Sequence, residues 1–477
     1  MAKAPYVAVH VKSSEPGRRV GAREIADSIA HEIRGGRLPA GARLPPVRAL
    51  EQQLGSSKNT VQAAYEELVA RGLIVARARD GVYVTHADDE VAPREPTREP
   101  AAAQWAAPLL TSEDRRGMFE LGSVFIDPEL LPRERLAECF RAAMRDGGPM
   151  PFYDPQGYAP LRVAIAERLR GRGIAAEADD VVVTVGSQQA LDIVARALQT
   201  RAIAIEDPGY RYVVPLLRSL GHTVTGLPLD PFAGIDLARW RTMLRDAQPG
   251  LVYATTSFHN PTGYSYTSSE LIALLELSAQ QGFALMEDDW GSDMLSGSEY
   301  RPTLRALGGP RVLYVNSFTK KLLPSLRIGF VLADATAVPA LVAAKRTSVL
   351  GGNLLAEMAL FEFLDRGYYD THLAQLQRAL DERYQACLAA LRETMPSTAR
   401  WTTPGGGPTL WLDLPRGTDL VRLRERMATR GIHIEPGETN FIATPHLYGF
   451  RIGYARHPPA ALARAIAALA EEIGALT

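Results

Sequence analysis

The sequence predicts a multidomain chain in which a mostly helical N-terminal module precedes a larger α/β body. The chain has 477 residues, more than one hydrophobic core usually holds. The segment "HADDEVAPREPTREPAAAQWAAP" (86–108) is rich in Pro, Ala and charge and has no sustained apolar period, which indicates an extended linker. We therefore expect a first domain at 15–85, a linker at 86–114 and a second domain at 115–475.

Composition fits an ordinary globular protein, with 46% hydrophobic and 22% charged residues. The apolar stretches are too short to span a membrane, and the first 20 residues lack the apolar core of a signal peptide. Cys139 and Cys387 give neither a disulfide framework nor the spacing of a metal site. These observations favour a cytoplasmic protein that has no metal site and no membrane partner.

Charge is divided unevenly along the chain. Residues 1–86 carry 13 Lys/Arg and 8 Asp/Glu, a net charge of +5, which leaves −6 for the remainder of a chain whose total is −1. A basic module on an acidic body suggests a polyanionic partner for the first part alone.

The N-terminal module begins with two helical patterns. In "GAREIADSIAHEIRGG" (21–36), Ile25, Ile29 and Ile33 are spaced four apart, which predicts one buried helix face that ends before the glycine pair. A loop rich in Pro and Gly follows at 37–46. "VRALEQQLG" then predicts a short second helix, which Gly55 closes.

A third helix and a hairpin complete this module. Ser57 is a candidate cap for "KNTVQAAYEELVARG" (58–72), whose buried face would be Val61, Ala64, Tyr65 and Leu68. "LIVARARDGVYV" (73–84) predicts a small hairpin that turns at Asp80-Gly81.

This order of elements is that of a winged helix-turn-helix, a mostly α domain whose third helix enters the DNA major groove. The N-terminal residues of that helix would lie nearest the bases, and their short polar and cationic side chains suit base edges and phosphates. A solvated helix start and a charged hairpin are the plainer interpretation. The candidate DNA-binding residues are Arg48, Ser57, Lys58, Asn59, Thr60 and, in the wing, Arg77 and Arg79.

The stretch "GRLPAGARLPPVRALEQQLGSSKNTVQAAYEELVARGLIVARARDGVYV" resembles the DNA-binding domain of GntR-type bacterial regulators. The resemblance implies that Arg48, Lys58, Thr60 and the wing glycine Gly81 take part in binding operator DNA. Lys58 stands where that family often has arginine, a difference that can alter base preference.

In the body, five strand-like apolar runs alternate with helical stretches, which predicts a mostly parallel sheet covered by helices. The runs are 180–186, 202–209, 251–257, 283–289 and 311–317. After the last run, "NSFTKKLLPSLRIGF" (316–330) places Lys320 and Lys321 inside an apolar stretch. A lysine in such a place is either solvated on a loop or buried because it holds a group covalently.

An aldehyde cofactor such as pyridoxal 5'-phosphate (PLP) needs an amine and a phosphate site, and its pyridine nitrogen needs a carboxylate partner. "VTVGSQQALDIVARAL" passes from strand to helix at Gly186, Ser187 and Gln188, an arrangement that presents donors to a phosphate. Thr319 and Arg327 flank the lysine pair and could complete that site.

Candidates for the other requirements also follow strands. "FALMEDDW" brings an acidic triplet to the end of a strand, so Asp288 or a neighbour could face the ring. Tyr210 in "EDPGYRY" could stack on the ring, and Asn260 in "FHNPTGY" could hold its phenolic oxygen. Each feature alone is more often an ordinary turn, a solvated carboxylate or a packed tyrosine. Their joint occurrence favours a PLP site.

Six motifs resemble the fold-type I, class I aminotransferases in their order along the chain. They are "YDPQGYAPLR", "GSQQALD", "EDPGY", "HNPTG", "EDD" and "SFTKKLLPSLRIG". The resemblance covers roughly residues 115–475 and implies a PLP-binding α/β body with a small α+β subdomain. It also implies that Lys320 forms the Schiff base, with Lys321 as the other candidate.

The same resemblance implies the remaining roles. Asp288 would face the pyridine nitrogen and Asn260 the phenolic oxygen, and Arg451 in "FRIGYA" would bind a carboxylate. Tyr153 would reach the phosphate of a partner subunit. Trp290 is a departure, since the family usually has a tyrosine there, and an indole only donates a hydrogen bond. The residues implied around the phosphate are Gly186, Ser187, Gln188, Thr319 and Arg327.

A GntR-type domain joined to an aminotransferase-like body resembles the MocR subfamily of bacterial regulators. The resemblance covers nearly the whole chain and implies a head-to-tail homodimer that binds operator DNA. Its body would sense PLP itself, or an amino-acid or amine effector held as an aldimine, and Arg451 favours an effector with a carboxylate. Two hypotheses stay open beside it: a working aminotransferase with an autoregulatory DNA-binding module, and a scaffold that has lost its cofactor.

Overall fold

The computed structural model describes residues 6–11, 20–77, 80–85, 115–146, 154–294 and 301–476. The chain divides into two compact units, Met1–Pro108 and Leu109–Thr477. The expected linker at 86–114 lies outside the described residues, and so do Arg79 and Tyr153.

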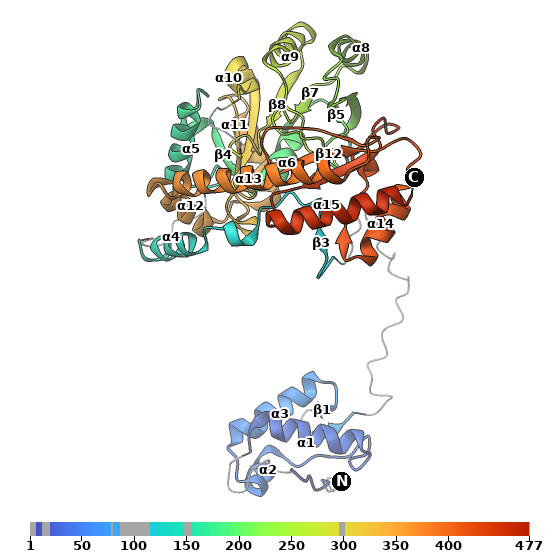
Figure 1. Cartoon of the computed structure of the whole chain (residues 1–477). Helices are drawn as coiled ribbons and strands as arrows, with labels where there is room; N and C mark the ends of the chain where they lie inside the picture. The colour runs from blue at the N-terminus through green and yellow to red at the C-terminus, as the bar shows by residue number, and fades with distance from the viewer. Residues whose placement is uncertain are drawn as a thin grey trace. The chain divides into compact units, whose positions relative to one another are not determined.

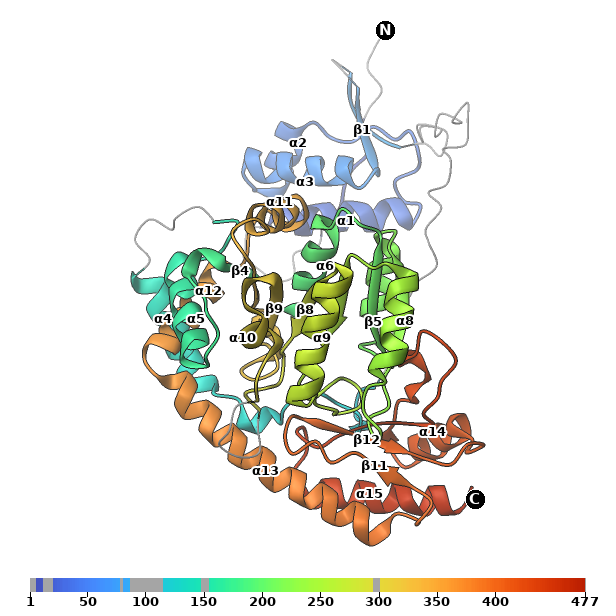
Figure 2. The same cartoon turned by 90° about the horizontal axis from the view of Figure 1, so that it is seen from above.

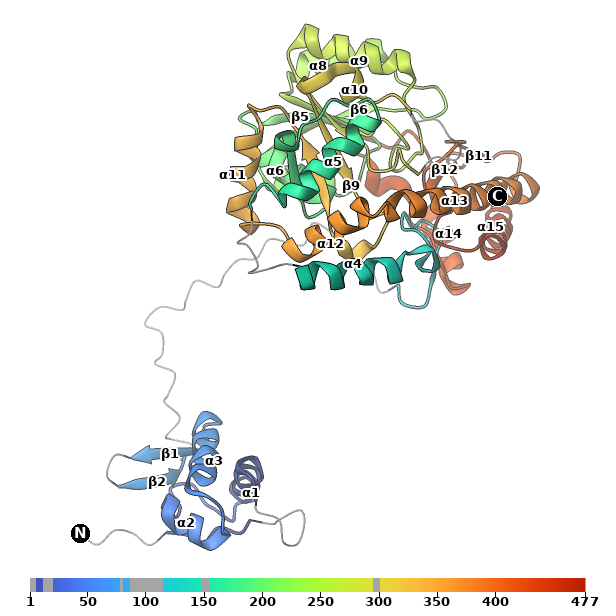
Figure 3. The ribbon, with the colours of Figure 1, turned by 90° about the vertical axis from the view of Figure 1, so that its left-hand side faces the viewer.

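The smaller unit has the predicted three helices and hairpin (Figure 3). Ser57 caps the third helix as predicted, since its Oγ accepts a hydrogen bond from the Thr60 N–H at 3.2 Å. Ile25, Ile29 and the four predicted residues of the third helix are buried, while Ile33 is only half-buried. The elements are α1 (Ala22–Arg34), α2 (Val47–Leu54), α3 (Lys58–Ala70), β1 (Ile74–Arg77) and β2 (Gly81–Val84), and the two strands pair antiparallel.

The larger unit contains a seven-stranded sheet in the order β4-β10-β9-β8-β7-β5-β6. The strands are β4 (Val181–Thr184), β5 (Ala202–Asp207), β6 (Thr223–Pro228), β7 (Leu251–Ala254), β8 (Ala284–Asp288), β9 (Val312–Ser317) and β10 (Gly329–Leu332).

All five predicted strands are present, as β4, β5, β7, β8 and β9, and the sheet is mostly parallel as expected. Two strands were not predicted. β6 is a half-buried edge strand, and β10 lies antiparallel between β4 and β9. A short apolar run with no helix before it gives little sign of such a return strand.

Helices cover both faces of the sheet (Figures 1 and 2). Alternate residues of the strands point to opposite cores, since Val182 packs in one cluster and Val181 and Val183 in another. The helices are α4 (Arg133–Asp146), α5 (Ala159–Gly171), α6 (Ser187–Ala197), α7 (Val213–Ser219), α8 (Leu237–Ala247), α9 (Ser268–Gln281), α10 (Leu304–Gly308), α11 (Val338–Val349) and α12 (Leu354–Asp365).

The expected small α+β subdomain is also present. An antiparallel sheet of β11 (Arg400–Trp401), β12 (Thr409–Asp413) and β14 (Gly449–Gly453) packs with three helices around Leu410, Phe450 and Ile466. Two further short strands, β3 (Phe119–Glu120) and β13 (Ile432–His433), pair in parallel. The helices are α13 (Tyr368–Thr394), α14 (Leu420–Thr429) and α15 (Pro459–Gly474), and α13 and α15 lie side by side (Figure 1).

A search of the described helices found none that is both long and apolar enough to cross a membrane.

Candidate cofactor site and DNA-binding surface

The two adjacent lysines lie in opposite environments. Lys321 is 1% exposed, and its Nζ donates to Asp293 Oδ1 at 2.7 Å and to Asn316 Oδ1 at 2.8 Å. Lys320 instead lines a cavity at the ends of the parallel strands, with its Nζ 3.7 Å from the centre of the Phe125 ring. Lys320 is therefore the amine that a molecule in the cavity would meet.

Burial lowers the pKa of Lys320 to about 7, and the nearby cations Arg451 and Arg327 add to this shift. A large fraction of this amine is therefore neutral near pH 7. A neutral amine is the nucleophilic form that attacks a carbonyl carbon.

The cavity around Lys320 also includes most of the ring-binding residues predicted from the sequence. Tyr210, Asn260, Asp288 and Trp290 line it, and so does Ser187, the first residue of α6. Val124, Tyr253 and Thr255 complete the lining and were not predicted, because nothing in their local sequence marks them.

Asp288 ends β8 and is buried under the cavity. Burial raises its pKa to about 7, although the Tyr253 hydroxyl donates to its Oδ2 at 2.8 Å and opposes that rise. Its Oδ1 is buried and has no hydrogen-bond partner among the described residues. A protonated ring nitrogen of a ligand would supply the missing donor.

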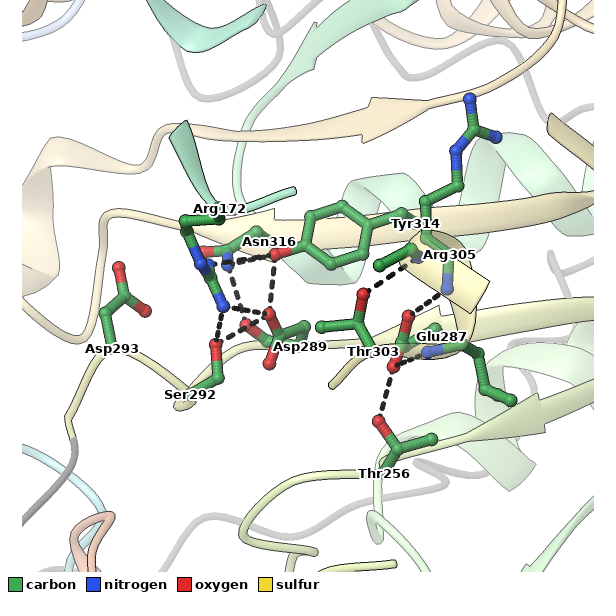
Figure 4. A network of polar contacts seen from close by, with 12 residues as sticks. Arg172, Thr256, Glu287, Asp289, Ser292, Asp293, Thr303, Arg305, Tyr314 and Asn316 are labelled. Carbon is green, nitrogen blue, oxygen red and sulfur yellow. Dashed lines mark hydrogen bonds and ion pairs between the residues drawn. The ribbon is translucent and has the colours of Figure 1, made fainter. Parts of the chain in front are cut away.

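The carboxylates on either side of Asp288 are bound in separate networks (Figure 4). Glu287 accepts from the Thr256 hydroxyl at 2.5 Å and from the Leu304 N–H at 2.8 Å. Asp289 Oδ2 accepts from Tyr314 at 2.6 Å and Arg172 at 3.1 Å. Of the three acidic residues, only Asp288 lines the cavity.

Donors also gather where β4 turns into α6. Gly186 has φ +81°, and a Cβ added to it would come within 3.0 Å of Arg327 Nη2. Arg327 also donates to the Val185 carbonyl at 2.9 Å. Thr319 Oγ1 is buried without a partner in the described part of the chain. A helix N-terminus, a guanidinium and an unpaired hydroxyl are suited to a phosphate.

Gln188, the other residue predicted here, has a buried Oε1 with no partner among the described residues. It follows Ser187 in the first turn of α6 but is not among the residues that line the cavity.

Arg451 of β14 reaches the same site from the subdomain. Its Nη1 donates to Asn260 Oδ1 at 2.6 Å and its Nε to the Gly122 carbonyl at 2.9 Å. The first bond orients the Asn260 amide so that Nδ2 is the end that can donate to a ligand. Burial lowers the pKa of Arg451 to about 10, and Arg211 adds to this shift.

Trp290 is 6% exposed and lines the cavity beside Lys320. Its Nε1 is buried and unpaired within the structure's described ranges. The indole thus offers one donor and no acceptor at this position.

The candidate DNA-binding residues of the smaller unit mostly lie on its surface. Lys58 and Asn59 are exposed in the first turn of α3, and Arg48 is exposed in the first turn of α2. The hydroxyls of Ser57 and Thr60 are 2.8 Å apart. An exposed helix N-terminus with a lysine is suited to phosphate contacts.

The wing depends on a residue that sequence reasoning missed. Arg43 donates from Nη2 to the Asp80 carbonyl at 2.8 Å and lies under Gly81, which has φ +137°. The Arg77 guanidinium lies over the Tyr83 ring, 4.8 Å from its centre. Because Arg43 belongs to the loop before α2, only the fold brings it to the turn.

Comparison with known proteins gives two family matches. Residues 130–469 match aminotransferase class I and II, and residues 22–84 match the gntR family of bacterial regulatory proteins. The HTH-type transcriptional regulator TauR of Rhodobacter capsulatus is 31% identical, over 93% of this chain and 95% of its own. The probable rhizopine catabolism regulatory protein MocR of Rhizobium meliloti is 28% identical, over 94% and 92%.

Among solved structures, LysN, the α-aminoadipate aminotransferase of Thermus thermophilus, resembles the larger unit. It matches with a TM-score of 0.71 and 30% identity over 76% of this chain and 93% of its own, and was solved with N-(5'-phosphopyridoxyl)-L-leucine. Both halves of the chain thus match the families that their motifs resemble. The chain belongs to the MocR-type GntR transcriptional regulators, whose aminotransferase class I and II domain follows a DNA-binding domain.

Proposed function

We propose that this transcriptional regulator binds PLP through Lys320 and changes its binding to operator DNA when PLP or an amino-acid effector occupies the site. The observation that carries this proposal is the cavity that Lys320 and Asp288 both line, together with the Asp288 Oδ1, which has no hydrogen-bond partner in the described part of the chain. An amine with a lowered pKa is complementary to an aldehyde, and a buried carboxylate with one oxygen still open to a donor is complementary to a pyridinium nitrogen.

The residues present fit this cofactor. Lys320 Nζ would hold its aldehyde carbon, Asp288 its ring nitrogen, Asn260 Nδ2 its phenolic oxygen, and Tyr210 would stack on the ring. When bound, PLP serves as an electron sink for an attached amine. The phosphate would be held by Gly186, Ser187, Gln188, Thr319 and Arg327, and by Tyr153 of the partner subunit.

The proposed effector site is beside the cofactor, where Arg451 would bind the effector's carboxylate. Trp290 offers one donor and no acceptor, so it could hydrogen-bond an oxygen of the cofactor or effector but could not accept a proton from either. An effector can shift the body between conformations only if it binds one of them more tightly.

The proposed DNA-binding surface is the start of α3 with the wing. Lys58, Asn59 and Thr60 would contact bases or phosphates, Arg48 would contact the backbone, and Arg77 and Arg79 would follow the adjacent groove. A head-to-tail homodimer would present two such surfaces to the two halves of an operator. In such a dimer each cofactor site would include a residue of the other subunit.

The deciding experiment measures the near-visible absorption of the full chain with PLP, together with its affinity for promoter DNA. We expect a cofactor band in the wild type and none in Lys320→Ala. We also expect that an amino acid changes the DNA affinity of the wild type and not that of the variant. Arg218→Gln is a matched control, since Arg218 is exposed on α7 and does not line the cavity.

Other outcomes would support the other two hypotheses. Repeated bleaching of the band by an amino acid and its recovery with a keto acid, with unchanged DNA affinity, would indicate a working aminotransferase. A scaffold would be indicated if the chain shows no cofactor band and the Lys320→Ala variant still regulates normally.

A further inference from the structure

A second, wider cleft opens beside the cofactor cavity and shares Val124, Tyr210, Asn260 and Lys320 with it. Its charged lining is mainly cationic. The cations are Arg115, Arg211, Lys320, Arg327 and Arg451, and the anions are Glu120 and Glu435.

Several of these charges already have partners or assigned roles. Arg327 lies at the Gly186 turn, and Lys320 would be bound to the cofactor. Glu120 faces Arg456, with 3.5 Å between Oε2 and Nε. Two features of the cleft are left to explain. Arg451 donates hydrogen bonds to the neutral oxygens of Asn260 and Gly122. Glu435 forms ion pairs with both Arg211 and Arg115.

Arg211 lines the cleft from the segment that joins β5 to α7. It follows the β5 turn and precedes α7, and its side chain is 15% exposed. Its guanidinium lies over the Tyr212 ring, 5.1 Å from the centre. Its Nε is buried with no hydrogen-bond partner in the residues described. Because Glu435 is shared between two guanidiniums, Arg211 has only part of a counter-charge.

The positive charge of Arg211 also acts on Arg451. Burial is the main cause of the lowered pKa of Arg451, and the charge of Arg211 is the second. These two cations therefore lie close enough to repel each other. A ligand with a single carboxylate would compensate one of them. A ligand with two anionic groups would compensate both.

We propose that the effector is an amino acid with a second acidic group on its side chain. Arg451 would bind the α-carboxylate, and Arg211, with Arg115 beside it, would bind the distal carboxylate or sulfonate. This inference rests on the proposed function, since it assumes that the effector's amine reaches the cofactor at Lys320. Arg211 is then the residue that selects acidic over neutral amino acids.

The test is isothermal titration calorimetry of the PLP-loaded full chain with L-glutamate and L-aspartate against L-glutamine and L-asparagine. A hydrogen-bonded charge is worth about 1.5–3 kcal/mol, so we expect the acidic member of each pair to bind about 10- to 150-fold more tightly. L-cysteate, the sulfonate analogue of L-aspartate, distinguishes a sulfonate effector from a carboxylate one.

Variants then assign the preference to a residue. Arg211→Gln should reduce it to about threefold or less while the cofactor band is unchanged, since a neutral amide cannot bind an anion as strongly. Arg451→Gln should weaken all four amino acids alike, and Arg218→Gln should change nothing. The proposal is overturned if the acidic and neutral partners bind equally, or if Arg211→Gln keeps the full preference.

The preference for acidic amino acids is measured separately from the cofactor absorption band. If PLP fails to bind, the proposed cofactor function is wrong, and the same amino acids titrated into the chain without PLP then show whether the cleft itself prefers two anionic groups. A preference for acids that persists in Arg211→Gln would mean that another cation of the cleft selects the ligand, and would likewise overturn the role given to Arg211.

Discussion

At the scale of single residues, the lysine pair shows how environment separates two identical side chains. Lys320 and Lys321 are neighbours in the sequence, yet one lines a cavity and the other is enclosed with Asp293. Although burial opposes it, the Lys321 ammonium and Arg172 hold the pKa of Asp293 below its ordinary range. Lys321 thus serves a buried ion pair, and Lys320 remains available to a ligand.

The first prediction concerns the pH dependence of PLP uptake by Lys320. Only the neutral amine attacks an aldehyde, so the rate of covalent binding should rise as pH increases through about 7 and level off above it. Arg451→Gln removes a cation that lowers this pKa and should move the curve to higher pH. Stopped-flow absorption measures the rate, and a midpoint near that of an ordinary lysine would contradict the prediction.

The second prediction concerns Lys321. Replacement by Met leaves Asp293 buried without its cation, which should lower the free energy of unfolding by about 3–5 kcal/mol. The double variant Lys321→Met, Asp293→Leu removes both charges and should recover most of that loss. Urea unfolding followed by circular dichroism measures both. An equal loss in the single and double variants would mean that packing, and not charge, is responsible.

At the scale of elements, strand and helix ends position the groups of both candidate sites. Asp288 is the last residue of β8, Ser187 the first of α6, and Lys58 the first of α3. The donors and carboxylates that a regular element cannot pair internally are concentrated at these ends.

The third prediction concerns the start of α3. Lys58→Ala should weaken binding to operator and unrelated DNA to a similar degree. It should also reduce the slope of log affinity against log salt concentration by about the amount that one phosphate contact contributes. Arg71→Ala removes the same charge at the opposite end of α3, where Arg71 pairs with Asp27, and should leave the slope unchanged. Fluorescence anisotropy at several salt concentrations measures the slope, and equal effects of the two variants would point to net charge alone.

The fourth prediction concerns the turn between β4 and α6. Gly186 has φ +81°, and a Cβ there would crowd Arg327. Gly186→Ala should therefore lower the free energy of unfolding by about 1–3 kcal/mol and weaken PLP binding at least tenfold. Gly173→Ala is a control with φ +77° and open space around its Cβ, so it carries the strain without the crowding. A titration of the cofactor band measures the difference, and equal PLP affinity in both variants would contradict the proposed phosphate site.

At the scale of the whole molecule, two compact units divide the chain near residue 108. A ligand stabilises the unit that binds it, by an amount set by its concentration relative to its dissociation constant.

The fifth prediction concerns the melting temperatures of the two units. PLP at 100 times its dissociation constant should stabilise the larger unit by about 2.7 kcal/mol and so raise its melting temperature by several degrees. The melting temperature of the smaller unit should be unchanged. Differential scanning calorimetry of the full chain, with Lys320→Ala as control, measures this, and a shift of both transitions would show that the units unfold together.

The sequence by itself determined most of what depends on local patterns. Periodicity and caps predicted α1–α3 and the hairpin, and apolar runs predicted five of the seven strands of the main sheet. Motif order then led to Lys320, Asp288, Asn260 and Arg451, because each stands at the end of a recognisable strand or within a recognisable motif.

Only the tertiary structure decided the relations between distant segments. The place of β10 between β4 and β9, the bond from Arg451 to Asn260, and the support of the wing by Arg43 each join residues far apart in the chain. Which lysine faces the cavity, and that Arg211 meets Glu435, were likewise settled by packing. Local sequence sets the conformation of a segment, whereas burial and charge pairing between segments arise when the chain folds on itself.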